Sequence, residues 1–442
     1  MPPAPSRRLL AIADDLSGAA ETAAGLLSRT TRSRVLLVHP VTLRQELADV
    51  PRSPGEATVL DLDSRYLPPA PAADRVRAAL AGVDPGTPVL AKIDSLLRGN
   101  TAATAAALAE GGAPVLAAPA LPAAGRTVRS GVVHLGDTPL HLTDAWRVET
   151  AAPPRSLADA FAPLPVELID LGTVRAPRAR LAAALATATA AGRLAACDAE
   201  TDQDLDAIAG AALALPRAPR LIGAGGLAAA LGRQLASGQG PGTGRVAAGE
   251  GPAVQAGGPP SLPPPRGDRP VLVVVGSAEP VTAAQISQLT ADGAVHHALP
   301  SAALAAAVAP SPLGALPLAE DVTVLSVAPT GTGERREDPR AVVRGLAALA
   351  AATVAAAPRP VDLVLTGGET ARRVLEALAI HELEPRGQIH HGAVLSRTRD
   401  ERSVVTRPGS FGGPDSLRRI VRALRPGPPT APIAPTKRKV LP

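Results

Sequence analysis

Residues 8–27, RLLAIADDLSGAAETAAGLL, decide the fold class of this 442-residue chain. The apolar run at residues 8–13 has the length and composition of a buried strand, and Asp14 and Asp15 end it. The small and apolar residues 19–27 are typical of a helix packed against a sheet. Strand, acidic turn and helix in this order indicate a mostly parallel sheet covered by helices.

The same order recurs along the first half of the chain. Further strands are expected at residues 34–38, 58–62, 88–92, 114–118 and 220–222. The pattern breaks at residues 238–269, which are dense in Gly and Pro and have the composition of a linker. Strands are expected again at residues 270–275, 322–327, 362–366, 392–395 and 403–406.

The sequence therefore predicts two mostly parallel-sheet α/β domains with helices on the faces of the sheets, joined by a Pro/Gly-rich linker. The predicted boundaries are residues 1–237 for an N-terminal domain, 238–269 for the linker, 270–425 for a C-terminal domain and 426–442 for a disordered tail.

Composition limits the partners. Aromatic residues make up 1% of the chain, so stacking on aromatic rings, a main route to single-stranded nucleic acid, is almost closed. The net charge of +5 suits anionic small molecules. A lone Cys197, the lack of a signal peptide and the lack of a long apolar run predict a cytoplasmic protein with no membrane or nucleic-acid partner. A homo-oligomer is left open.

Four consecutive strand ends in the first half carry polar or charged side chains. They comprise Asp14 and Asp15, residues 63–65 (DSR), residues 92–100 (KIDSLLRGN) and Arg126. Ligands of open α/β sheets bind at the carboxyl ends of the strands, so these groups predict one pocket for a polar anion. For single motifs a structural role is the alternative, such as a helix cap by Asp15 or salt bridges within residues 92–100.

Three glycine turns follow strands in the second half, at residues 276–282 (GSAEPVT), 366–371 (TGGETA) and 407–413 (RPGSFGG). A small-residue turn that opens a helix offers backbone N–H groups to a phosphate. Glu369 and Thr370 could meet a ribose, a phosphate or Mg²⁺. None of the turns is a Walker A sequence and each alone could be a tight turn, but together they predict a nucleotide site. The scattered histidines predict no protein-held metal.

In content, order and spacing, these motifs resemble the four-carbon acid sugar kinase family. The resemblance covers nearly all of residues 8–425. It rests on ADDLSGA (13–19), KIDSLLRGN (92–100), PALPAAGRT (119–127), VVVGSAEPVTAAQI (273–286), LVLTGGETA (363–371) and VVTRPGSFG (404–412).

The resemblance implies an N-terminal domain that binds a sugar acid and a C-terminal domain that binds ATP, with Mg²⁺ as a second cofactor. It also implies phosphorylation of the terminal hydroxyl of threonate, erythronate or a 3-oxo-tetronate-like acid in carbohydrate catabolism. The candidate catalytic residues are Asp14, Asp15 and Asp94. The candidate substrate-binding residues are Ser17, Arg65, Lys92, Ser95, Arg98, Gly99, Asn100 and Arg126. The candidate ATP-binding residues are Ser277, Thr282, Gly367, Gly368, Glu369, Thr370, Arg407, Gly409 and Gly412.

The chain departs from the family's usual pattern at several of these positions. Ser17 stands where Thr is usual and keeps the hydroxyl. Leu121 and Ala124 stand where Phe and Asn are usual, and the loss of the amide at position 124 is expected to alter substrate contacts. Arg407 replaces the usual Lys and keeps its charge but not its shape.

The expected reaction is direct transfer of the γ-phosphoryl group of ATP to a substrate hydroxyl, which depends mainly on positioning and charge neutralisation. Asp15 or Asp14 would orient or deprotonate the hydroxyl, with Asp94 in reserve. Lys92, Arg98 and Arg126 would hold the substrate carboxylate.

Two other functions stay open. A Mg²⁺-dependent phosphatase could use Asp14 or Asp15 as its nucleophile, although the glycine turns of the second half argue against it. A non-catalytic ligand-binding protein on a kinase scaffold is the other, and the changes at Ala124 and Arg407 keep it open.

Overall fold

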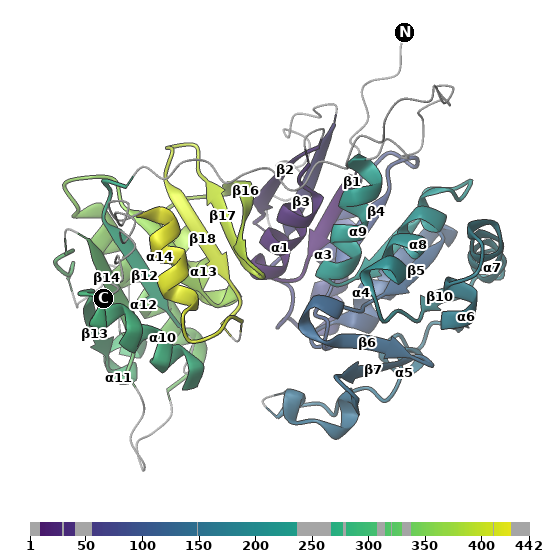
Figure 1. Ribbon diagram of the computed structural model, residues 1–442, viewed down its shortest axis with the longest axis horizontal. Helices are drawn as coiled ribbons and strands as arrows, with labels where there is room; N and C mark the ends of the chain where they lie inside the picture. Colours follow the sequence, from purple (N-terminus) through teal and green to yellow (C-terminus); the bar gives the residue numbers. More distant parts are fainter. Residues whose placement is uncertain are drawn as a thin grey trace, which may run out of the picture.

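One mixed sheet of 15 strands runs through the whole structure (Figure 1). The computed structural model describes residues 9–28, 31–39, 55–147, 149–236, 267–276, 280–306, 314–319, 321–328, 337–409 and 411–425. We refer to residues 9–236 as the first unit and residues 267–425 as the second unit.

The first unit contributes eight strands, all parallel to their neighbours within the unit. Central strand β1 is buried along its whole length, which explains its unbroken apolar sequence. In spatial order the strands are β2 (Arg32–Leu37), β3 (Glu56–Asp61), β1 (Leu9–Ala13), β4 (Val89–Lys92), β11 (Arg220–Gly223), β5 (Val115–Ala118), β10 (Leu194–Cys197) and β9 (Val166–Ile169).

The second unit contributes seven strands. Five of them are parallel, and β17 runs antiparallel to both of its neighbours. In spatial order they are β13 (Val295–Leu299), β14 (Val322–Val327), β12 (Val271–Val275), β15 (Asp362–Thr366), β18 (Ser403–Arg407), β17 (Ala393–Arg397) and β16 (Glu382–His390).

An antiparallel pairing of β16 with β2 joins the two units. Glu382 lies opposite Leu36 and Leu383 opposite Val35. One cluster of buried apolar side chains also extends across both units, from Leu9 to Leu363. The two sheets expected from the sequence are therefore edge-to-edge parts of one sheet.

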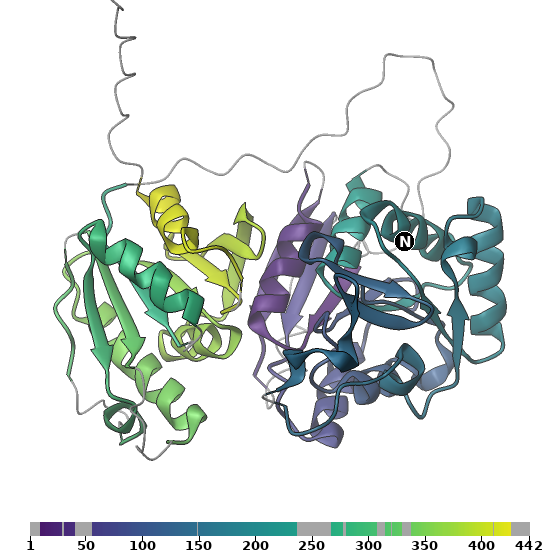
Figure 2. The same cartoon turned by 60° about the horizontal axis from the view of Figure 1, so that its bottom comes forward.

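Helices cover both faces of this sheet, as Figures 1 and 2 show. Helix α1 packs on α9 of its own unit and also touches α13 of the second unit. In the first unit the helices are α1 (Leu16–Leu26), α3 (Pro69–Leu80), α4 (Thr101–Ala109), α5 (Leu157–Ala160), α6 (Leu171–Val174), α7 (Arg178–Ala190), α8 (Asp202–Leu213) and α9 (Gly225–Ala236). In the second unit they are α10 (Pro280–Ala291), α11 (Ser301–Ala306), α12 (Pro339–Ala355), α13 (Gly368–Ala377) and α14 (Ser416–Leu424).

A small antiparallel sheet of three strands flanks the first unit. It comprises β6 (Arg126–Arg129), β7 (Val132–Leu135) and β8 (Thr138–Pro139). Two short 3₁₀ helices follow it, Leu140–Leu142 and Asp144–Trp146. The indole nitrogen of Trp146 donates to the carbonyl oxygen of Leu96 at 2.8 Å, so this segment is tied to the loop after β4.

The α/β class and the strands expected from the sequence are confirmed, with ends shifted by at most two residues. No sequence pattern indicated β9, β10, β13 or β16. Residues 238–266 and 426–442 lie outside the described residues, so the expected linker, tail and domain boundaries stay predictions.

Candidate active site

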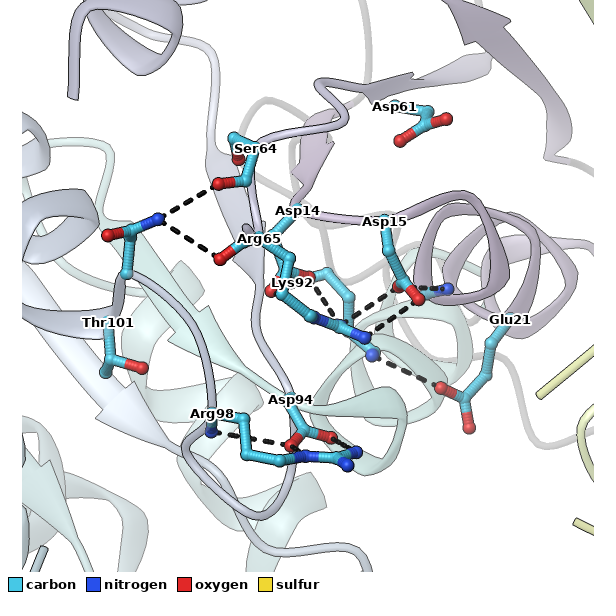
Figure 3. Close-up of polar contacts among 12 residues, drawn as sticks. Asp14, Asp15, Glu21, Asp61, Ser64, Arg65, Lys92, Asp94, Arg98 and Thr101 are labelled. Atoms are coloured by element: carbon cyan, nitrogen blue, oxygen red, sulfur yellow. Dashed lines mark hydrogen bonds and ion pairs between the residues drawn. The ribbon is translucent and has the colours of Figure 1, made fainter. Parts of the chain in front are cut away.

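Asp14 and Asp15 leave the carboxyl end of β1 and share one arginine, Arg65 (Figure 3). The guanidinium donates to Asp14 Oδ1 and Oδ2 at 2.8 Å each, and to Asp15 Oδ2 and Oδ1 at 2.8 and 3.0 Å. Asp15 also caps α1, because its Oδ1 accepts from the backbone N–H of Gly18 at 2.8 Å. The adjacent acids therefore have two structural roles: Asp15 caps α1, and both carboxylates form ion pairs with Arg65.

Burial raises the pKa of Asp14 above its ordinary value, although Arg65 acts in the opposite direction. Burial also disfavours the charged form of Arg65, but the two carboxylates outweigh it and hold the pKa of Arg65 well above its usual value. The loop that carries Arg65 is fixed in turn, because Ser64 N and Arg65 N donate to the carbonyl oxygen of Asp14 at 2.9 and 3.1 Å.

The loop after β4 brings most of its predicted residues to the same place. Lys92 is buried and lies 3.4 Å from Glu21 Oε2 on α1. Arg98 Nε donates to Asp94 Oδ2 at 2.5 Å. Burial works against the charge of Asp94, but Arg65 and Arg98 outweigh it and hold the pKa of Asp94 below its ordinary value. Asp94 therefore stays ionised and is poorly suited to take a proton.

Asn100 and Gly99 shape the loop from within. The amide nitrogen of Asn100 donates to the carbonyl oxygens of Ser64, Arg65 and Leu67 at 3.0, 3.2 and 2.9 Å. Gly99 lies beside Asp14 and Arg65. In the structure both residues support the Arg65 loop, and a direct substrate contact by either remains a prediction.

Arg126, at the start of β6, reaches both units. Its guanidinium donates to the hydroxyl of Ser95 and lies 5.7 Å from the ring centroid of Phe411 in the second unit. The Phe411 ring stacks on His391, with 5.4 Å between centroids. Burial lowers the pKa of Arg126. Within the described residues Arg126 forms no ion pair with a carboxylate.

In the second unit, the turns after β12, β15 and β18 adjoin one another. Gly367 N donates to the carbonyl oxygen of Arg407 at 2.9 Å. The hydroxyl of Thr370 lies so close to Gly276 that a Cβ there would collide with it. Thr282, in the first turn of α10, is buried and its hydroxyl has no partner among the described residues. Ser277 lies outside the described residues.

Arg407 is fully buried behind these turns. It donates to Gln285 Oε1 at 2.6 Å, to Ser416 Oγ at 3.1 Å and to the carbonyl oxygen of Phe411. Burial lowers the pKa of Arg407 to about 10. Its guanidinium therefore holds the 407–413 turn from inside, and a direct contact with phosphate remains a prediction, as do those of Gly409 and Gly412.

The two sets of residues meet at the first residue of α13. A Cβ on Gly368 would lie 2.5 Å from Asp15 Oδ2 and 3.1 Å from Ser17 Oγ. Ser17 Oγ and Glu21 Oε1 are buried without a hydrogen-bond partner in the described part of the chain. Buried polar atoms without partners are rare in folded proteins and indicate a place for a ligand or water.

A cleft of about 390 Å³ opens next to this junction. It lies between the loop after β3 and helices α12 and α13. Its walls are charged on both sides and include one aromatic ring: Asp63, Tyr66, Leu67, Arg340, Arg344, Glu369, Arg373 and Glu376. Glu369, which the sequence assigned to the nucleotide, is one of these wall residues.

Sequence reasoning missed a second set of contacts between the units. Arg372 of α13 pairs with Asp61 at 2.9 Å, and Arg373 pairs with Asp63 at 2.7 Å. The available signal was weak: Asp61 is a carboxylate at the end of an apolar strand run, and Arg372 lies on the buried side of a helix. The sequence around Asp61 does not identify Arg372 as its partner, and the sequence around Arg372 does not identify Asp61.

In the described part of the chain, no group of three or more His, Cys, Asp or Glu side chains is arranged to hold a metal ion. Among the same residues, no helix combines the length and apolar character needed to cross a membrane.

The fold and the site define a two-unit α/β protein in which the polar turn after β1 lies against the glycine turn after β15. The family models for a sugar-binding N-terminal domain and a nucleotide-binding C-terminal domain match residues 9–231 and 272–417. The chain belongs to the four-carbon acid sugar kinase family, and the prediction of a sugar-acid kinase is confirmed at this level.

Relatives cover almost the full chain. A D-threonate kinase of Cupriavidus necator is 34% identical over 92% of this chain and 96% of its own length. A D-threonate kinase of Bordetella bronchiseptica is 31% identical, with 94% and 96% covered. A 3-oxo-tetronate kinase of Burkholderia multivorans is 29% identical, with 95% and 98% covered.

Solved structures share the fold. The Haemophilus influenzae protein HI1011 superposes with a TM-score of 0.66 at 20% identity, covering 94% of this chain and all of that protein. A Salmonella typhimurium protein superposes with a TM-score of 0.70 at 22% identity, covering 93% and 98%.

Proposed function

We propose that this protein transfers the γ-phosphoryl group of ATP to a hydroxyl group of a four-carbon sugar acid, with D-threonate as the first acceptor to test. The contact of Gly368 with Asp15 carries the proposal. It sets the glycine turn of the second unit directly beside the acidic turn of the first, so that a phosphoryl group bound at one turn would lie next to a hydroxyl group bound at the other.

The second unit is suited to a triphosphate. Backbone N–H groups at the start of α13 point out of the helix, and such N-termini favour anions. The unpaired hydroxyls of Thr282 and Ser17 are further hydrogen-bonding groups near the turns in the described structure. Mg²⁺ bound mainly through phosphate oxygens would neutralise charge on the phosphates, and the unpaired hydroxyl of Ser17 is a protein oxygen within the described structure that could approach it.

Asp15 is the better placed of the two adjacent acids to accept the proton of the acceptor hydroxyl. Arg65 donates to both oxygens of each acid, but only Asp15 lies against Gly368 of the glycine turn. As the acceptor oxygen bonds to the γ-phosphorus, the bond from that phosphorus to the bridging oxygen of ADP breaks, and Asp15 takes the proton.

Arg126 is our first choice for the carboxylate of the sugar acid. Arg98 is paired with Asp94 and Lys92 lies beside Glu21, so their charges are already balanced within the protein. Arg126 forms no ion pair with a carboxylate in the described structure, and a half-buried cation favours an anionic ligand.

The direct test is an assay of purified protein with MgATP and a panel of threonate, erythronate and 3-oxo-tetronate isomers, with ADP and phosphorylated acid measured separately. We expect one acid to be phosphorylated. Asp15→Asn should abolish this activity and leave ATP binding mostly intact. Asp137→Asn is the matched control, since that side chain is 99% exposed.

Three outcomes would contradict the role of Asp15 or the proposed activity. Near-normal turnover by Asp15→Asn would rule out Asp15 as the proton acceptor. Release of phosphate from sugar phosphates without ATP, or thermal stabilisation by an acid with no turnover, would favour a phosphatase or a binding protein instead.

A further inference from the structure

Arg372 anchors helix α13 inside the first unit. It is 3% exposed, and Asp61, its partner on β3, is 0% exposed. Its Nη1 donates to Asp61 Oδ2 at 2.9 Å and to the carbonyl oxygen of Asp61 at 3.2 Å, and its Nη2 donates to the carbonyl oxygen of Val38 at 2.7 Å. The remaining donor, Nε, binds Glu376 on the same helix at 2.7 Å.

The position of Arg372 on α13 links this anchor to the site. Gly368, the residue that touches Asp15, precedes Arg372 by four residues, and residues four apart lie on the same face of a helix. One face of α13 is therefore held against the first unit at two successive turns. Arg373 adds a less buried contact to Asp63 at 2.7 Å.

Asp61, the partner of Arg372, lies close to the acidic turn that carries Asp14 and Asp15. It ends β3, which pairs with β1 so that Asp61 lies beside Ala13, the residue before Asp14. The segment after Asp61 carries Arg65, which binds both Asp14 and Asp15. A shift of Asp61 relative to α13 would thus also shift the two carboxylates relative to Gly368.

We propose that Arg372 and Asp61 are positioning residues that hold the glycine turn of α13 in register with Asp15, so that phosphoryl transfer goes to the sugar acid and not to water. This inference rests on the proposed function. Neither residue touches the reacting atoms. Their effect would come from geometry, since a displacement of about 1 Å in a reacting pair can cost roughly 100-fold in rate.

The specific consequence is uncoupling. A junction that fits poorly admits water, and water then competes with the acceptor hydroxyl for the γ-phosphoryl group. Loss of the Arg372–Asp61 pair should therefore raise the ratio of ADP formed to phosphorylated acid formed. A residue that only stabilised the fold would lower the amount of active protein and leave this ratio unchanged.

The experiment compares Arg372→Gln, Arg372→Lys and Asp61→Asn with the unaltered protein, using the same acid and MgATP. We expect kcat for Arg372→Gln to fall roughly 100-fold, with KM for both substrates changed by less than about threefold. The ratio of ADP to phosphorylated acid should rise in Arg372→Gln. The values for Arg372→Lys should lie between those of Arg372→Gln and those of the unaltered protein. Arg418→Gln is the matched control, because its ion pair with Asp292 lies wholly within the second unit.

The outcomes separate this inference from the proposed function. Unaltered kcat and an unaltered ratio in a folded Arg372→Gln would overturn the positioning role while the kinase stands. If Arg372→Gln does not fold, the ratio of ADP to phosphorylated acid is measured for Arg372→Lys. A raised ratio supports the positioning role, and an unaltered ratio overturns it.

If the unaltered protein phosphorylates no acid, the proposed function fails and amide hydrogen exchange tests the junction directly. Faster exchange at residues 61–65 and 368–372 in Arg372→Lys supports the anchor, and unchanged exchange there overturns it.

Discussion

Gly368 and Asp15 touch across the junction of the two units, with room for a hydrogen but not for a methyl group between them. A Cβ at Gly368 would lie 2.5 Å from Asp15 Oδ2, which is closer than real Cβ contacts come. Because Asp15 is also held by Arg65 and by the N-terminus of α1, it cannot move aside freely. The distance between the acidic turn and α13 is therefore set by the absence of a side chain.

Gly368→Ala should lower kcat by about 10- to 100-fold, because the added methyl has to push α13 away from Asp15. Ala has a higher helical propensity than Gly, and this gain opposes the strain of the added methyl group. The thermal midpoint should therefore change little. Gly86→Ala is the control, since a Cβ at Gly86 has no atom within 4 Å. Equal kcat values for the two variants would show that the close approach does not matter for the reaction.

Arg126→Gln should raise KM for the sugar acid about 10- to 100-fold, the effect of losing one charge-assisted hydrogen bond. KM for ATP should change far less. Arg129→Gln on the same strand is the control, because Arg129 is paired with Glu200 and Asp137 at the surface. A larger change in KM for ATP than for the acid would instead assign Arg126 to the nucleotide.

Much of the site could be predicted because its residues follow strands of a parallel sheet, whose carboxyl ends lie at one edge. That rule, applied to the sequence alone, is enough to group Asp14, Arg65, Lys92 and Arg126. It also groups the glycine turns of the second half. The facing of Asp15 and Gly368 does not follow from this rule, because the antiparallel pairings β2–β16, β16–β17 and β17–β18 make the parallel strands of the two units run in opposite directions.

What could not be predicted depends on pairs far apart in sequence. Asp61 and Arg372 are 311 residues apart, and neither has a local pattern that names its partner. Strand β16 was missed because Pro385 and Gly387 interrupt its apolar alternation, and its register with β17 shifts between these two residues and again between Gln388 and His390. Arg407 looked like a phosphate ligand because sequence gives its charge but not the direction of its side chain.

Arg407→Lys tests what that arginine does. Lysine is the family's usual residue, but here it would leave some of the acceptors on Gln285, Ser416 and Phe411 without a donor. We expect a loss of about 2–3 kcal/mol in the free energy of unfolding, typical of hydrogen bonds to a charged group. KM for ATP should rise more than KM for the acid, since the 407–413 turn would loosen.

Thermal and chemical unfolding of Arg407→Lys, compared with Arg399→Lys, would measure this effect. Arg399 is exposed and forms a surface ion pair with Glu382, so its change should be near zero. If Arg407→Lys is as stable as the unaltered protein and binds ATP more tightly, the arginine is a tolerated substitution that weakens a direct phosphate contact.

The Asp61 carboxylate should make the stability of the protein depend on pH in an unusual direction. Burial raises the pKa of Asp61 from 3.8 to about 6, although Arg372 of α13 opposes the rise, and the neighbouring Asp63 adds to it. Arg75 of α3 also acts on this carboxylate. The folded protein thus holds the Asp61 proton more tightly than the unfolded chain does. The stability contributed by this group is complete below about pH 4 and is lost as the pH rises through about 6.

Comparison with Asp61→Asn isolates this group, because the amide does not titrate. The free energy of unfolding of the unaltered protein, minus that of Asp61→Asn, should fall by roughly 2 kcal/mol between pH 4 and pH 7. Denaturation can be followed through Trp146, the only tryptophan of the chain. Asp137→Asn, at an exposed position, should give a nearly constant difference over the same range. A constant difference for Asp61→Asn as well would mean that Arg372 keeps Asp61 ionised throughout, with the ion pair outweighing the cost of burial.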